Sequence, residues 1–362
     1  MDKIWRLILR IYVIILITYA GFSQMKKNEG TRFGNFQAKI ESVAETSVFI
    51  SFKADTTNYA LFLSTSGECL TKGELLTFKN ELGADTIDYP LLKLYPRIGK
   101  FIASSVPKEG KICIKNLATR NDYWLLIYKV MKDSLEYVAK TSFSTIAQKP
   151  EYQALNLAFD DVTDSSFVVS WVNGSGEGRI LVLAEGERLE TPENGKDYGS
   201  SSVFGKGGII GNKCFVVYDG KEPRPKVKVT GLEPSTKYTI AVFEYNGEGK
   251  YRHYNLAKES NNPRVLTTRL SPPKISSIEK VDENVYEIRW QESKGATSYI
   301  LDVAKDKDFK QFVEPYQELD IGDLQKYEIS DLVPNEKYFI RMKAKGPNGE
   351  SAYSPTFELK TK

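Results

Sequence analysis

The chain has 362 residues, of which 41% are apolar and 27% charged, values that are ordinary for a soluble globular protein of two or three domains. It carries 50 lysines and arginines against 47 aspartates and glutamates, and it has no long run of either charge. This balance argues against dedicated nucleic-acid binding, which needs a concentrated basic patch, so we expect no nucleic-acid partner.

The first 23 residues have the form of a secretory signal peptide. The segment MDKIWRLILR is basic, IYVIILITYA is apolar, and GFSQ offers small residues on both sides of Phe22. This pattern predicts cleavage after Ser23 and export to the periplasm or the exterior. The alternative is an uncleaved membrane anchor, but the apolar run after Arg10 ends near Phe22, short of the roughly 20 residues of a spanning helix. We therefore expect no membrane span in the mature chain.

Alternation of apolar and polar residues then predicts strands that are buried on one side. The segments SVFISF, SFVVSW and VYEIRW alternate in this way, and each precedes a second strand, namely YALFLS, RILVLA and YILDVA. Turn-forming residues separate the strands, and no convincing amphipathic helix is found in the mature chain. Short alternating strands with Gly and Pro between them are typical of β-sandwiches.

One spacing motif occurs three times and defines three predicted domains. A Leu stands six residues before a Tyr in NLATRNDYWLLIYKV, GLEPSTKYTIAVFEYNG and DLVPNEKYFIRMKAKGPNG, and apolar residues alternate behind each Tyr. Short linkers with Pro, IAQKPEY and TRLSPPK, separate the repeats and predict semi-rigid joints. We predict a signal peptide over residues 1–23 and domains over residues 31–147, 150–268 and 271–362.

These residues carry a family resemblance. Each repeat resembles a fibronectin type III domain, through Trp171 and Trp290 in the early strands and the later Leu-x-Pro-x-x-x-Tyr segments. The second repeat also resembles repeats of secreted bacterial surface proteins. The first repeat departs from the pattern, because Phe52 stands in place of the Trp and Ala118 and Thr119 stand where a Pro is usual. The resemblance implies an all-β chain of three immunoglobulin-like sandwiches, in which each Tyr hydroxyl bonds to backbone upstream.

The first two repeats contain roughly twenty more residues before the Tyr than the third, and such insertions often hold function. The simpler interpretation is extra edge strands and turns. The insertion of the second repeat includes FGKGGIIGNK, whose spacing and context do not fit a phosphate-binding loop, so turns are expected there. The three cysteines, Cys69, Cys113 and Cys214, follow no framework spacing, and a Cys69–Cys113 disulfide stays open.

Catalytic constellations are scarce. His253 is the only histidine, and neither HExxH nor GxSxG occurs. Asp160 and Asp161 precede a strand and are expected to form a solvated turn. We therefore predict no catalytic residues, no metal site and no cofactor, although carboxylates of a hydrolase across a cleft are not identifiable from sequence.

The segment EYNGEGKYRHYN, residues 244–255, is the most unusual surface segment. It combines residues that are enriched in binding hot spots, and we select Tyr245, Tyr251, Arg252, His253 and Tyr254 as candidate partner-binding residues. The alternative is a hairpin whose Tyr rings cover the edge of a sheet. The Arg-Gly-Asp triplet of some animal relatives does not occur.

Scaffold residues repeat while site-forming residues are scarce, so we predict a non-enzymatic exported interaction or spacer protein. Its partner would be a protein, or a glycan, at the cell surface, and adhesion between proteins is the preferred role. A monomeric rod is expected. The alternative is a glycan-binding accessory protein beside extracellular enzymes, which would require exposed, coplanar aromatic rings.

Overall fold

The computed structural model describes residues 31–33, 36–55, 59–65, 94–95, 99–104, 109–131 and 135–362. The predicted signal peptide, Cys69 and most of the insertion of the first repeat lie outside these residues. The chain divides into two compact units, and each is described by itself. Unit 1 comprises residues 1–151, 192–197 and 245–255, and unit 2 comprises residues 152–191, 198–244 and 256–362.

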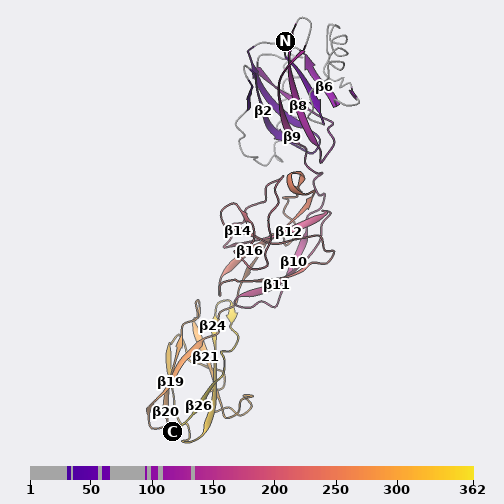
Figure 1. Ribbon diagram of the computed structural model, residues 1–362. Helices are drawn as coiled ribbons and strands as arrows, with labels where there is room; N and C mark the ends of the chain where they lie inside the picture. The colour runs from indigo at the N-terminus through magenta and orange to yellow at the C-terminus, as the bar shows by residue number, and fades with distance from the viewer. Residues whose placement is uncertain are drawn as a thin grey trace, which may run out of the picture. The chain divides into compact units, whose positions relative to one another are not determined.

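The first sandwich consists of two antiparallel sheets (Figure 1). One sheet has the order β1-β2-β3-β7 and the other β5-β6-β4-β8-β9. The first contains β1 (Thr31–Phe33), β2 (Phe36–Val43), β3 (Val48–Ala54) and β7 (Glu109–Ile114). The second contains β4 (Tyr59–Ser64), β5 (Leu94–Tyr95), β6 (Gly99–Ser104), β8 (Asp122–Val130) and β9 (Leu135–Ser144). Their facing side chains form one apolar core, which includes Phe36, Ile50, Leu61 and Leu125.

The second sandwich repeats this arrangement with the sheets β10-β11-β15 and β13-β14-β12-β16-β17, and β18 also pairs with β16. Its first sheet contains β10 (Leu155–Asp160), β11 (Ser166–Val172) and β15 (Lys226–Thr230). Its second contains β12 (Gly178–Glu185), β13 (Ile209–Ile210), β14 (Cys214–Gly220), β16 (Lys237–Asn246), β17 (His253–Tyr254) and β18 (Arg264–Thr267). The short 3₁₀ helix η2 (Gly249–Tyr251) precedes β17. Trp171, Leu181 and Tyr238 lie in the core between the sheets.

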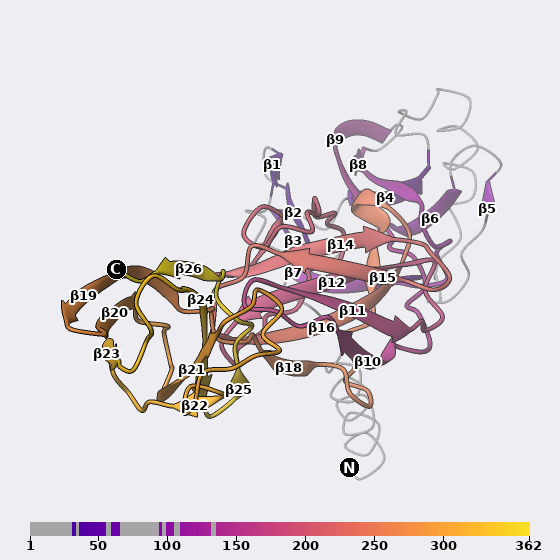
Figure 2. The ribbon, with the colours of Figure 1, turned by 90° about the horizontal axis from the view of Figure 1, so that it is seen from below.

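The third sandwich has the sheets β19-β20-β23 and β22-β21-β24-β25, and β26 pairs with β24. In Figure 2, β19, β20 and β23 lie on one side of this sandwich and β21, β22 and β25 on the other. The first sheet contains β19 (Lys274–Asp282), β20 (Val285–Gln291) and β23 (Lys326–Ile329). The second contains β21 (Ser298–Ala304), β22 (Leu319–Asp320), β24 (Lys337–Gly346), β25 (Gly349–Glu350) and β26 (Phe357–Lys360). Trp290, Leu301 and Tyr338 belong to its core.

The strand order confirms the all-β prediction. The triplets β2-β3-β7, β10-β11-β15 and β19-β20-β23 correspond to one another, and so do β6-β4-β8-β9, β14-β12-β16-β18 and β22-β21-β24-β26. Within the described ranges, six sheets enclose three hydrophobic cores. Each core lies between the faces on which the sequence places its apolar residues, because alternate side chains of a strand point to opposite faces.

The hydroxyl of each motif tyrosine is hydrogen-bonded to backbone upstream, as the resemblance implies. Tyr123 accepts a hydrogen bond from the Ala118 N–H at 2.8 Å, Tyr238 from the Glu233 N–H at 2.9 Å, and Tyr338 from the Val333 N–H at 2.9 Å. The three leucines of the motif, Leu117, Leu232 and Leu332, are buried beside them. The repeated Leu-to-Tyr spacing is therefore a folding device, which fixes the bend before the long strand of each sandwich.

Part of the insertion of the second sandwich closes one of its edges. We call residues 199–210 the edge segment. Val203 pairs in parallel with Thr230 at the end of β15, whereas β13 pairs with β14 in the other sheet. The Phe204 ring contacts the rings of Phe215 and Tyr238, with centroids 5.1 and 5.2 Å apart. The glycine-rich run thus forms extra edge pairing and turns, as the simpler interpretation of the sequence predicts.

Candidate functional site

The loop segment, residues 244–255, extends a ribbon of the second sandwich. Tyr245 pairs with Tyr254 and Asn246 with His253, so that β16 and β17 continue past the Asn246-Gly247 turn signal. Gly247 has a φ of +78°, and a Cβ there would lie 2.6 Å from the carbonyl oxygen of Tyr251. This position therefore requires glycine, because an L side chain would be strained and would collide with the backbone.

Three of the five candidate residues form one buried stack. The guanidinium of Arg252 lies 3.8 Å from the ring centroid of Tyr245 and 5.9 Å from that of Tyr254. Arg252 is 5% exposed, Tyr245 2% and Tyr254 1%. The charge is neutralised by Asp197, whose Oδ1 lies 2.7 Å from the Arg252 Nε. A desolvated cation–π contact of this kind stabilises by up to about 2 kcal/mol, so these three side chains hold the ribbon together.

The other two candidates, Tyr251 and His253, are half-buried and contact the linker that follows β9. The Tyr251 carbonyl accepts a hydrogen bond from the Ala147 N–H at 2.8 Å. The His253 Nδ1 lies 2.9 Å from the Ala147 carbonyl oxygen and 3.4 Å from Glu45 Oε1. Burial lowers the pKa of His253 below its ordinary value, so the neutral ring with a proton on Nδ1 suits the Ala147 carbonyl.

Further polar contacts tie the same loop segment to residues 122–150. Lys250 Nζ lies 2.6 Å from Asp122, and this hydrogen bond lowers the pKa of the Asp122 carboxyl. The Asn246 amide donates to the Gln148 carbonyl at 2.8 Å, and the Asn255 amide donates to the Pro150 carbonyl at 3.1 Å. The loop segment therefore binds the linker backbone at three successive places within unit 1. Assignment of the five candidate residues to an external partner stays a prediction.

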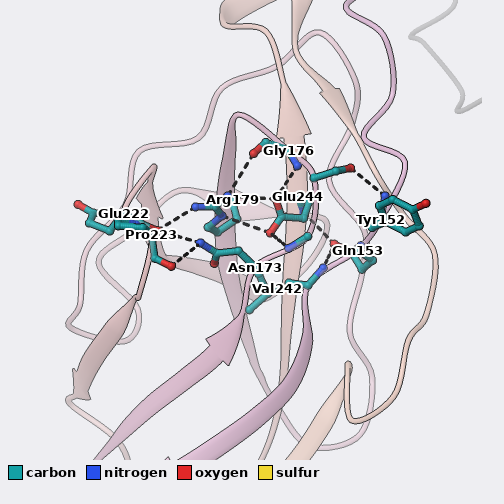
Figure 3. A network of polar contacts seen from close by, with 12 residues as sticks. Tyr152, Gln153, Asn173, Gly176, Arg179, Glu222, Pro223, Val242 and Glu244 are labelled. Atoms are coloured by element: carbon teal, nitrogen blue, oxygen red, sulfur yellow. Dashed lines mark hydrogen bonds and ion pairs between the residues drawn. The ribbon is translucent and has the colours of Figure 1, made fainter.

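A second polar cluster, which sequence reasoning missed, closes one end of the core of the second sandwich (Figure 3). Glu244 continues the inward series Tyr238, Ile240 and Val242 of β16, and it is 0% exposed. Arg179 faces it from the start of β12, with its Nε and Nη2 both 3.2 Å from the two Glu244 carboxylate oxygens. A bidentate pair of this geometry is among the stronger charge-assisted contacts.

The carboxylate of Glu244 has four donors in all. Besides Arg179, the backbone N–H groups of Gly174 and Gly176 donate to its two oxygens, each at 3.0 Å. Arg179 also donates to the Glu222 carbonyl at 3.0 Å and to the Gly176 carbonyl at 3.2 Å. With these bonds made, the pair fixes the β11–β12 and β14–β15 turns. A charged residue in an inward register position was the one sequence signal that could have found it.

The structure offers no metal centre in the parts of the chain that it describes, where no three His, Cys, Asp or Glu side chains are placed to hold an ion. Among the same residues, no helix has the length and apolar character needed to cross a membrane. Cys113 is half-buried and lies outside the core of the first sandwich, and its pairing with Cys69 falls outside the described residues.

A family-model match agrees with the architecture of the second sandwich. Residues 148–260 match the family model described as fibronectin type III domain. The chain is similar to the chicken CNTN1 FN1–FN3 domains, at 15% identity over 90% of this chain and 97% of that chain, with a TM-score of 0.23. It is also similar to a two-domain fibronectin type III segment from chicken tenascin, at 18% identity over 57% of this chain and 99% of that chain, with a TM-score of 0.31.

The matched residues contain almost the whole second sandwich, and the described strands before and after it in the sequence repeat its order. The fibronectin type III match therefore applies to the second sandwich, and the other two sandwiches share its strand order.

Proposed function

We propose that this chain is an exported, non-enzymatic spacer and interaction protein that contributes to protein–protein adhesion at the cell surface. Fibronectin type III domains are generally scaffolds, and the buried Arg179 and Glu244 of the second sandwich bind each other and backbone groups of the same sandwich. Export rests on the signal-peptide pattern of residues 1–23. The proposed mature chain is monomeric, and on strand lengths of about 33 Å a rod of three sandwiches would approach about 100 Å.

The observation that carries the spacer role is the fixation of the linker in unit 1. The loop segment forms hydrogen bonds with backbone groups of three linker residues, Ala147, Gln148 and Pro150. A spacer transmits distance only if its joints resist bending, and a linker with its own hydrogen-bond partners loses the freedom of a loose tether. The spacer role therefore depends on this hydrogen-bonded linker more than on any single pocket.

The joint can be tested by small-angle scattering of the mature chain and of the double variant Asn246→Ala/Asn255→Ala. These substitutions remove the amides that bind Gln148 and Pro150. We expect the scattering profile of the native chain to fit a narrow range of extended shapes and that of the variant to fit a broader range. Asn348→Ala is the matched control, because Asn348 is exposed and remote in sequence from the linker. A compact sphere for the native chain, or identical profiles for native and double variant, would contradict the spacer role.

Export is tested separately by sequencing the N-terminus of the protein recovered after expression in a secreting host. A terminus at Gln24 supports it. Recovery of an intact Met1 terminus in the membrane fraction would contradict it.

A further inference from the structure

The sequence contains four Asn-Gly pairs, at Asn173, Asn194, Asn246 and Asn348. An Asn-Gly pair can undergo spontaneous deamidation, because the glycine amide nitrogen is unhindered and can approach the Asn side chain. The reaction requires the side-chain amide to swing onto the following backbone nitrogen. A pair whose Asn side chain is held by other hydrogen bonds is therefore protected, and the structure separates the four pairs on this criterion.

The first two pairs have both groups engaged. The Asn173 amide donates to the carbonyls of Glu222 and Pro223 at 3.0 and 3.1 Å, and the Gly174 N–H donates to buried Glu244. The Asn194 Oδ1 accepts a hydrogen bond from the Tyr254 N–H at 2.9 Å. The Gly195 N–H donates to the Arg252 carbonyl at 2.7 Å.

The third pair is held through its side chain and its surroundings. The Asn246 amide donates to the Gln148 carbonyl at 2.8 Å, and Asn246 pairs with His253 in the ribbon. A Cβ on Gly247 would lie 2.9 Å from the Ala147 Cβ, so little space is available for the rotation that the reaction needs.

The fourth pair differs from the other three. Asn348 and Gly349 lie in the turn between β24 and β25, where Gly346 pairs with Gly349, and both residues are exposed. Among the described residues, the Asn348 side chain has no hydrogen-bond partner. A Cβ at Gly349 would meet nothing within 4 Å, so the turn is uncovered on that side.

We propose that Asn348 is a site of spontaneous deamidation in the folded protein and that the other three pairs are protected. The Gly349 nitrogen loses its proton and attacks Asn348 Cγ. The N–Cγ bond forms, the Cγ–Nδ2 bond breaks, and ammonia leaves with the proton. Water then opens the resulting succinimide at either carbonyl and gives aspartate or isoaspartate at position 348. The step involves no oxidation, and it adds one negative charge at neutral pH beside Glu350, which pairs with Lys343 at 2.7 Å.

The test is peptide mapping by mass spectrometry of the full chain after incubation at mildly alkaline pH, with fragmentation that distinguishes isoaspartate from aspartate. Since one hydrogen bond changes an equilibrium by up to about tenfold, we expect Asn348 to react faster than the other three asparagines by a factor on the order of ten. In urea the four rates should converge, because the protection comes from the folded structure. The variant Asn348→Gln should lose the fast phase and leave the slow sites unchanged.

Equal rates at all four sites in the folded chain would overturn the proposal. So would a rate advantage of Asn348 that persists undiminished in urea, because it would then belong to the local sequence and not to the fold.

Discussion

The hydroxyls of Tyr238 and Thr268 hold the same residue from opposite sides. Tyr238 accepts a hydrogen bond from the N–H of Glu233 at 2.9 Å, and Thr268 donates one to the carbonyl of Glu233 at 2.6 Å. Thr268 also accepts a hydrogen bond from the Thr236 N–H at 2.9 Å. Both backbone groups of Glu233, its N–H and its carbonyl, are thereby hydrogen-bonded, and this fixes the bend before β16.

The same arrangement occurs in the other sandwiches. Thr145 donates to the Ala118 carbonyl at 2.7 Å, opposite Tyr123, and Thr361 donates to the Val333 carbonyl at 2.6 Å, opposite Tyr338. All three threonines are buried. A buried hydroxyl with both a donor and an acceptor role is costly to remove, since two backbone groups would be left without partners.

The first prediction concerns Thr268→Val, which keeps the shape of the side chain and removes the hydroxyl. We expect the second sandwich to lose about 1–3 kcal/mol of unfolding free energy, because the Glu233 carbonyl and the Thr236 N–H become unsatisfied. Urea unfolding, followed by hydrogen exchange of peptides from β16 and β18, measures the loss. Thr267→Val is the matched control at the adjacent, half-buried position, and a change of less than about 0.5 kcal/mol is expected there. Equal effects of the two substitutions would contradict the role of Thr268.

The second prediction concerns the buried pair of Arg179 and Glu244. Glu244→Gln should destabilise the second sandwich by about 3–5 kcal/mol, because the Arg179 guanidinium would remain buried without its counter-charge. The double variant Arg179→Met/Glu244→Met should be less destabilised than the sum of the two single variants, since each single variant leaves one buried charge unpaired and the double variant leaves none. Lys237→Met is the control on the same strand, because its pair with Glu187 is exposed and is expected to contribute little. Additive single effects in the cycle would show that the two groups do not interact.

The tyrosine corner with Thr268 and the Arg179–Glu244 pair show which parts of the structure could be predicted from the sequence and which could not. Alternation and the Leu-to-Tyr spacing are local patterns, so the strands and the Tyr238 corner could be predicted. Thr268 could not, because the threonines follow their tyrosines at different distances and no local pattern singles them out. Glu244 has its partners in turns far away in the sequence, with Arg179 65 positions earlier.

The candidate loop shows a different limit. Aromatic and basic residues crowd both binding surfaces and internal cation–π stacks, and their composition does not distinguish the two. Arg252 is buried because Asp197, contributed by a different stretch of the chain, lies 2.7 Å from it. The burial of Tyr245 and Tyr254 likewise depends on long-range packing, which the sequence pattern does not specify.

The third prediction concerns pH and His253. Burial lowers the pKa of His253 in the folded chain below its ordinary value of 6.5. The unfolded chain therefore binds the proton more readily, and stability that is present above about pH 6.5 should fall as the pH drops below that value. We expect exchange of the Ala147 amide, which donates to the Tyr251 carbonyl, to accelerate between pH 6.5 and about 5 once the intrinsic pH dependence of exchange is subtracted.

His253 is the only histidine in the sequence. A change in stability at pH values above the range where carboxylates titrate therefore comes almost entirely from this residue. The variant His253→Gln serves as the control and should show no step in this window. A step of the same size in that variant would assign the effect to another group and contradict the prediction.

The last prediction uses two glycines of the edge segment. A Cβ on Gly207 would collide with the Val216 carbonyl oxygen, whereas a Cβ on Gly199 would meet nothing within 4 Å. Val216 belongs to β14, and its backbone bonds Ser201 and Gly208, so it cannot withdraw without breaking the edge pairing. Gly207→Ala should therefore destabilise the second sandwich by about 1–3 kcal/mol, the range of overpacking, and expose the β15 edge to faster hydrogen exchange. Gly199→Ala should have little effect or should stabilise slightly, because alanine reduces the freedom of the unfolded chain. If the two substitutions behave alike, the run of glycines is not set by close backbone approach, and its composition would need another explanation.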